Sequence, residues 1–179
     1  MQMMNRIIMI VLAFLFIGSN VLTAQKFKYI GADKCKICHN KPATGEQYNK
    51  WKASLHAQAL KSLSNAKSLE YAKKNNIADP TKEASCLKCH STAASVDKAL
   101  IATLTPLEGV SCESCHGPGS GYKTATIMKD KKYAMQNGLI EPTQKVCEQC
   151  HNKENPFHKP FDFATYSAKI AHPNPALKK

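Results

Sequence analysis

The sequence predicts a small, mainly α-helical single domain with extensive loops. The chain has 179 residues, and beyond its N-terminal segment it contains few long apolar stretches. Segment 46–75 is rich in helix formers and lacks proline and glycine, which predicts one long helix or two, stopped by Asp79 and Pro80. The apolar residues expected near one side of this segment are Trp51, Leu55, Leu60 and Leu63. Clusters of proline and glycine elsewhere predict loops.

The N-terminal segment 1–24 has the pattern of a secretory signal peptide. Arg6 is its only charged residue, and an apolar run, Ile7 to Ile17, precedes small and polar residues with an expected cut after Ala24. The alternative, an uncleaved membrane anchor, needs a longer apolar run to span a bilayer. We therefore expect a periplasmic or otherwise exported protein whose mature domain is 25–179.

Four copies of the pattern CxxCH use all eight cysteines. Disulfides would explain an even number of cysteines, and zinc would explain paired CxxC, but neither requires a histidine after the second cysteine each time. CxxCH is the attachment signature of c-type haem. The sequence therefore predicts four covalently bound haem c groups. The attaching cysteines are Cys35, Cys38, Cys86, Cys89, Cys112, Cys115, Cys147 and Cys150, and the iron-binding histidines are His39, His90, His116 and His151.

The spacing within each motif has a physical reason. Positions i, i+3 and i+4 share one face of a helix, so two cysteines and a histidine can meet one porphyrin. Four porphyrins would supply the apolar surface that the polypeptide lacks, so we expect the domain to pack around closely spaced haems. An unloaded chain should be largely unfolded.

Three further histidines are candidates for the sixth ligand of the irons: His56, His158 and His172. Three histidines cannot serve four irons, so at least one iron lacks a second imidazole. That iron either takes a methionine, Met128 or Met135, or stays open to a small ligand.

Two segments that precede the second and fourth motifs resemble each other. YAKKNNIADPT, 71–81, aligns without a gap to YAMQNGLIEPT, 133–143. We expect each to form a helix end and a turn, with Thr81 or Thr143 capping the next helix, although two similar helix ends can also converge. The glycines and Pro118 after the third motif predict a tight loop, and the proline-rich tail predicts an irregular arm that covers a haem with aromatic rings.

Several phrases of the chain resemble the exported multihaem (tetrahaem) cytochromes c related to cytochrome c-554. The phrases are WKASLHAQA, GVSCESCHGPG, CHN after the last motif, and FDF followed by KIAHP. The resemblance implies a periplasmic electron carrier in which most irons have two histidines and one haem can be five-coordinate. By motif order that haem is the second, attached at Cys86, Cys89 and His90. The resemblance supports His56 and His172 more than His158, and Tyr122 stands where some relatives have a histidine.

These observations predict transfer of electrons between redox partners and no catalytic residue. Two alternatives stay open: reduction of nitrite, nitric oxide or hydroxylamine at an open haem, or a haem-bearing subunit of a larger complex. The formal net charge is +12, and propionates of four haems offset up to about eight charges. The remainder favours partner proteins with acidic docking surfaces. We expect no nucleic acid, and contact with a membrane only through partners.

Overall fold

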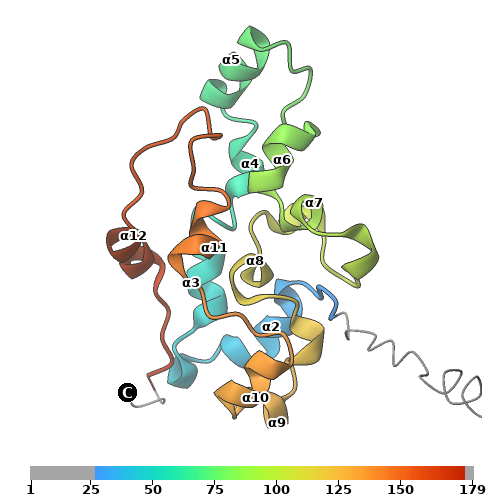
Figure 1. Ribbon diagram of the computed structural model, residues 1–179, viewed down its shortest axis with the longest axis vertical. Helices are drawn as coiled ribbons and strands as arrows, with labels where there is room; N and C mark the ends of the chain where they lie inside the picture. The colour runs from blue at the N-terminus through green and yellow to red at the C-terminus, as the bar shows by residue number, and fades with distance from the viewer. Residues whose placement is uncertain (1–26, 176–179) are drawn as a thin grey trace, which may run out of the picture.

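The computed structural model describes residues 27–175, and within that range the chain is mainly helical with no β-strand, which confirms the predicted fold class. One isolated bridge joins Tyr29 to Ile101. Along the long axis of the molecule, α5 lies at one end and α9 and α10 at the other (Figure 1). The α-helices are α2 (Ala32–His39), α3 (Gln47–Ala53), α4 (Ala59–Ser62), α5 (Ala66–Lys74), α6 (Ala84–His90), α7 (Thr92–Ser95), α8 (Cys112–His116), α9 (Ala125–Met128), α10 (Lys131–Gln136), α11 (Gln144–Glu148) and α12 (Phe163–Ile170). The 3₁₀ helices are η1 (Pro42–Thr44), η2 (Lys98–Leu100), η3 (Pro106–Glu108) and η4 (Gly119–Gly121).

None of the helices in this part of the chain is both long and apolar enough to cross a membrane. The expected signal peptide, 1–24, lies outside the described residues, and the boundary of the mature domain stays a prediction.

The expectation of one long helix or two over 46–75 is wrong, because this segment forms three short helices, α3, α4 and α5. Polar side chains at the breaks bond to the backbone and so compete with helix continuation. The Ser54 hydroxyl accepts from the amide of Ala57 at 3.5 Å, and the Asn65 side chain accepts from the amide of Ser68 at 2.9 Å. Leu55 falls in the first break and is 89% exposed, so it does not join the apolar side expected for it.

The two aligned segments fold alike where their helices end, which supports the internal repeat. The side chain of Asn75 donates to the Tyr71 carbonyl at 2.8 Å, and Asn137 donates to the Tyr133 carbonyl at 2.8 Å. In both copies the next residue has a positive φ, 56° in the first and 97° in the second, where glycine replaces asparagine. The chain therefore makes the same backbone turn before the second motif and before the fourth.

The expected helix cap at Thr81 is wrong. Thr81 bonds to the Asp79 carboxylate, and α6 begins later, with Glu83 as its N-cap residue accepting from the Ser85 amide. Thr143 does stand at the N-cap position of α11, without a side-chain cap bond. At the first copy of the repeat, a turn closed by the Asp79 side chain thus stands where a helix cap by Thr81 was expected.

The apolar core of the described chain is small. Its buried hydrophobic side chains are Ile30, Ala32, Tyr48, Leu63, Ala72, Ala93, Leu104, Tyr122 and Ala134. The largest fully buried side chains are polar: Glu113, Thr92, Ser91 and Ser111. Glu113 lies inside the third motif and Ser111 directly precedes it, and the Thr92 hydroxyl accepts from the Ser111 amide at 2.8 Å. Residue packing alone therefore supplies little apolar stabilisation at the centre of the domain.

Candidate functional site

Each CxxCH motif lies on a helical turn. The first three lie wholly within α2, α6 and α8. The fourth begins in α11 and continues past its end, where the His151 amide donates to the Cys147 carbonyl at 2.9 Å. Two cysteines and a histidine therefore share one face in every copy, as the spacing predicts.

The four motifs are neighbours in an order that differs from their order along the chain. The thiols of Cys35 and Cys112 are close enough to shift each other's pKa, which places the first motif beside the third. Cys89 and Cys150 join the second motif to the fourth in the same way. Cys115 lies close enough to Cys147 for the two to interact electrostatically. The spatial order is thus first, third, fourth, second.

Two of the motif histidines face a second imidazole. The ring centroids of His116 and His172 are 5.9 Å apart at an interplanar angle of 74°. Those of His56 and His151 are 6.1 Å apart at 86°. Two imidazoles that bind opposite sides of one metal ion have centroids roughly 6 Å apart, because each metal–nitrogen bond is about 2 Å long. Both pairs therefore fit the axial ligands of an iron.

The surroundings of these rings favour their neutral form, which is the form that binds metal. Burial lowers the pKa of His116, and the nearby His172 and His39 lower it further. Burial also lowers the pKa of His56 and of His151. The Nδ1 atom of His172 lies 2.8 Å from the Ile170 carbonyl oxygen, so the ring donates there and leaves Nε2 available.

His90 is oriented without a partner imidazole. Its Nδ1 lies 2.8 Å from the Ala59 carbonyl oxygen and 3.3 Å from the Ser62 hydroxyl, which again leaves Nε2 available. No ring contact joins His90 or His39 to another histidine within residues 27–175. His158 is exposed and near enough to His151 to influence its pKa, and its role as a ligand stays a prediction.

Known proteins with similar sequences share the region of the first three motifs. Residues 34–117, which contain the first three, match the family model for cytochrome c554 and c-prime. Cytochrome c-554 of Nitrosomonas europaea is 35% identical over 99 residues, covering 52% of this chain and 40% of that protein. Over this stretch the chain is similar to cytochrome c-554. No solved structure matches it significantly, and the match spans less than half the length of the Nitrosomonas protein.

The loop after the third motif is held by Tyr122. Tyr122 is 7% exposed, and its hydroxyl donates to the carbonyl oxygens of His116 at 3.0 Å and Gly117 at 2.9 Å. Gly117 has a φ of 77°, and a Cβ added there would lie 2.5 Å from the carbonyl oxygen of Gly138. The tyrosine therefore fastens the tight loop predicted here, with its hydroxyl turned to the backbone.

Glu113, inside the third motif, was missed by the sequence reasoning. It is 1% exposed, and its carboxylate accepts from the amides of Ile30, Gly31 and Gly119 at 2.6 to 3.0 Å. Burial raises the pKa of Glu113, and the three amide donors oppose that shift. The carboxylate thus ties the start of α2 to α8, the helices of the first and third motifs. The sequence feature that could have pointed to Glu113 is its position beside a glycine-rich loop, where several backbone amides can point at one carboxylate.

The C-terminal arm covers the fourth motif with aromatic rings, as expected, but it is not irregular throughout. It contains α12, whose N-cap residue Asp162 accepts from the Thr165 amide at 2.8 Å. The Phe161 ring stacks on His151, with centroids 4.8 Å apart and planes 22° apart. The Tyr166 ring lies 5.1 Å from Phe161. The arm therefore fixes the orientation of the His151 imidazole.

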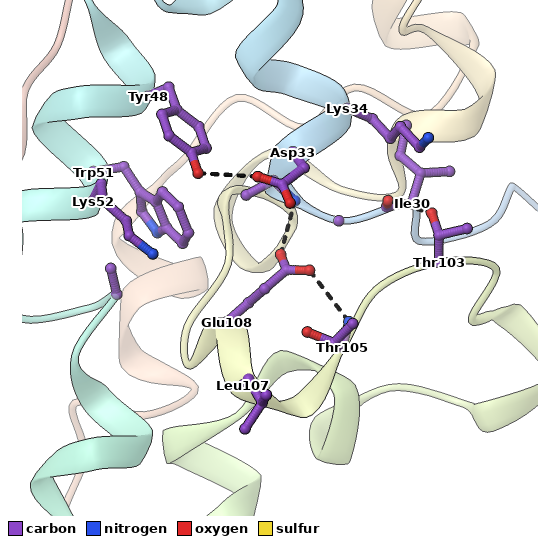
Figure 2. Close-up of a pocket in the computed structure, with 13 residues that line it drawn as sticks. Ile30, Asp33, Lys34, Tyr48, Trp51, Lys52, Thr103, Thr105, Leu107 and Glu108 are labelled. Atoms are coloured by element: carbon purple, nitrogen blue, oxygen red, sulfur yellow. Dashed lines mark hydrogen bonds between the residues drawn. The ribbon is translucent and has the colours of Figure 1, made fainter.

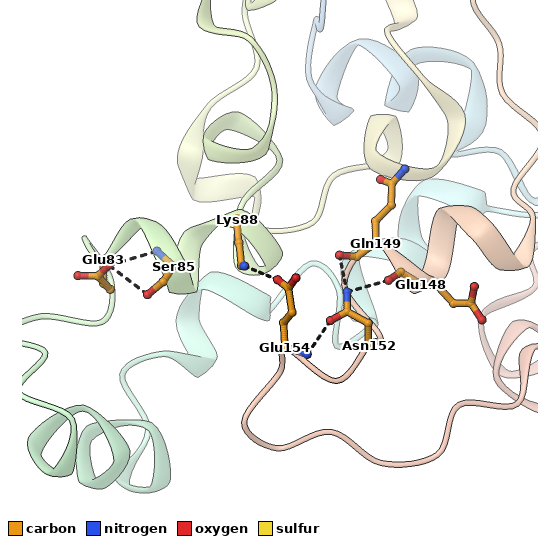
Figure 3. Close-up of polar contacts among 7 residues, drawn as sticks. All are labelled: Glu83, Ser85, Lys88, Glu148, Gln149, Asn152 and Glu154. Carbon is orange, nitrogen blue, oxygen red and sulfur yellow. Dashed lines mark hydrogen bonds and ion pairs between the residues drawn. The ribbon is translucent and has the colours of Figure 1, made fainter.

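An ion pair links the second motif to the segment after the fourth (Figure 3). Lys88, between the cysteines of α6, donates to the Glu154 carboxylate at 2.6 Å. The side chain of Asn152 orients the same segment, bonding to the carbonyls of Glu148 and Gln149 and to the Glu154 amide. The contact joins the same two motifs as the neighbouring Cys89 and Cys150.

This ion pair predicts a pH dependence. The hydrogen bond and positive charge of Lys88 lower the pKa of Glu154, so the pair stabilises the fold above the pKa of an unfolded glutamate. That contribution is lost as the pH falls through the lowered pKa that Glu154 has in the folded protein. We expect Lys88→Met to return the Glu154 pKa toward its ordinary value in a ¹³C NMR titration of the reduced protein. Lys61→Met, on α4, is the control, and an unchanged Glu154 pKa in Lys88→Met would rule the contact out in solution.

Proposed function

We propose that the chain is an exported tetrahaem c-type cytochrome that carries electrons between redox partners. The observation that carries the proposal is the pairing of His116 with His172 and of His151 with His56, beside helical CxxCH motifs. Bound haem c would supply a one-electron redox centre at each motif. The relationship to cytochrome c-554 supports the same class of activity.

The cysteines of the four motifs would hold the haems, and the chain's histidines would orient them. His39, His90, His116 and His151 would provide the first ligand at each motif. His172 would provide the second ligand opposite His116, and His56 opposite His151; His158 remains a candidate for another iron. Two imidazoles on an iron leave no place for a substrate, which favours electron transfer over small-molecule chemistry at those motifs.

The neighbour order of the motifs supports a carrier as well. Cys35 beside Cys112, Cys115 near Cys147 and Cys150 beside Cys89 place the four motifs in one row. A redox protein with such a row can accept an electron at one end and release it at the other. The excess of 25 lysines and arginines over 13 acidic residues favours partners with acidic surfaces.

A second candidate function rests on His90. Because no ring contact joins His90 to another histidine in the described part of the chain, an iron at the second motif could bind a small molecule. Reduction of nitrite, nitric oxide or hydroxylamine at that motif is the alternative to a pure carrier.

Electron paramagnetic resonance of the oxidised, haem-loaded protein tests both functions. We expect His56→Ala and His172→Ala each to convert one low-spin iron to high-spin, because each removes an imidazole that faces a motif histidine. Lys169→Ala, on the same arm as His172, is the control and should leave the spectrum unchanged. The same substitution at His158 decides whether that histidine binds an iron.

Two results would contradict the proposal. A wild-type spectrum retained in both His56→Ala and His172→Ala would remove the assigned ligand pairs. A high-spin signal in the wild type that nitric oxide or cyanide converts, together with turnover of nitrite or hydroxylamine, would favour the reductase.

A further inference from the structure

We propose that the outer face of α2, with the hollow beside it, docks a carboxylate-rich surface of the partner protein. This inference rests on the proposed function and adds where the partner binds. The hollow has a volume of about 320 Å³ and lies between α2, α3 and η3 (Figure 2). Its lining includes Asp33, Lys34, Trp51, Lys52, Leu107 and Glu108.

The hollow lies at the first turn of α2, where Ala32, Asp33 and Lys34 precede the attachment residues. Successive residues of a helix are rotated by about 100°, which places Asp33 and Ile37 together and roughly opposite Cys35, Cys38 and His39. None of the CxxCH residues lines the hollow. A partner seated there would be separated from the first motif's haem by little more than the thickness of one helix, about 10 Å.

The acidic side chains of the hollow are already satisfied. The Asp33 carboxylate accepts from the Tyr48 hydroxyl at 3.0 Å. The Glu108 carboxylate accepts from the Ala32 amide at 2.7 Å, the Thr105 amide at 3.2 Å and the Ser111 hydroxyl at 3.1 Å. Neither carboxylate is directed to a lysine.

The lysines of this face, in contrast, lack acidic partners. Within residues 27–175 the ion pairs are Lys74–Glu70, Lys82–Asp79, Lys88–Glu154 and Lys131–Glu141, and none lies on α2 or α3. Lys34 and Lys52 border the hollow, and Lys36, on the same helix as Lys34, lies over the Tyr48 ring of α3 at 5.3 Å. Carboxylates arriving on a partner would therefore supply the charges that this face lacks.

Exposed apolar side chains accompany these lysines. Ile37 is 72% exposed and Leu107 is 83% exposed. The residues between the cysteines of the fourth motif are instead Glu148 and Gln149, both exposed and polar. An apolar centre with a charged rim is the usual composition of a transient protein interface, and the surface at the first motif has this composition.

The test is stopped-flow reduction of the haem-loaded protein by flavodoxin hydroquinone, an acidic redox protein. Each transfer moves one electron, oxidising the anionic hydroquinone to the neutral semiquinone and reducing one ferric haem to ferrous. The double variant Lys34→Glu/Lys52→Glu is compared with Lys73→Glu/Lys132→Glu, which changes the charge equally on α5 and α10. We expect the second-order rate at low salt to fall about tenfold or more in the first variant and clearly less in the second. Ile37→Ser should lower the rate several-fold at high salt, where charges are screened.

Reduced lumiflavin, a small donor without the protein's charge, separates the possible failures. If lumiflavin reduces all variants at equal rates and the flavodoxin rates also do not differ between variants, the docking surface is overturned. The proposed electron-carrier function would then still stand. Failure of lumiflavin to reduce the wild-type haems would contradict the proposed function itself. A changed lumiflavin rate and midpoint potential in Lys34→Glu/Lys52→Glu would show that these lysines pair with the haem's own propionates, and would overturn the proposal. Binding to anionic vesicles that this variant abolishes would assign the face to a membrane instead.

Discussion

A chain produced without covalent haem attachment is expected to show no cooperative unfolding transition. The buried hydrophobic side chains are few, four of the nine are alanines, and the largest fully buried side chains are polar. Ordering a backbone residue costs about 1–2 kcal/mol of conformational entropy, and so small an apolar core cannot offset that cost over the described chain. Circular dichroism during urea titration, with and without haem assembly, measures the difference.

Variants of single motifs refine this expectation. The third motif neighbours both the first and the fourth, whereas the second lies at the end of the row. We therefore expect Cys112→Ser/Cys115→Ser to destabilise the domain more than Cys86→Ser/Cys89→Ser. A pyridine haemochrome assay should count three haems in each variant. A cooperative transition in the haem-free chain at the midpoint of the loaded protein would refute the haem-centred core.

Replacement of Glu113 by alanine is expected to destabilise the loaded protein on the order of 3–5 kcal/mol. The substitution leaves the amides of Ile30, Gly31 and Gly119 buried without their acceptor, and each unsatisfied donor costs about 1–3 kcal/mol. It also cuts the link between the start of α2 and α8. The free energy of unfolding from urea titration gives the magnitude.

The fourth motif offers a matched control for this substitution. Glu148 stands at the same position of CEQCH that Glu113 occupies in CESCH, but its side chain is exposed and bonds to Gln144 at 2.6 Å. Glu148→Ala should therefore change stability by no more than about 0.5 kcal/mol. Equal losses in the two variants would mean that the amide contacts of Glu113 contribute nothing specific.

The sequence predicted what depends on spacing within a few residues. The shared face of each CxxCH and the repeated turn at Asn75 and Asn137 follow from local geometry and are present. The prediction of one long helix or two over 46–75 was wrong, because the bonds of the Ser54 and Asn65 side chains to backbone amides outweighed the helix propensity of the segment. The meeting of His172 with His116 and the amides around Glu113 depend on segments distant in the chain, where no local pattern gives a signal.

The interleaved order of the motifs determines how the protein can be assembled. The first motif meets the third, and the second meets the fourth, so the N-terminal half of the chain contains no neighbouring pair of its own. A fragment ending after the second motif would hold two attachment helices and no junction between them. During synthesis, the N-terminal half must therefore wait for the C-terminal half before its motifs gain neighbours, although the sequence reads as a row of similar units.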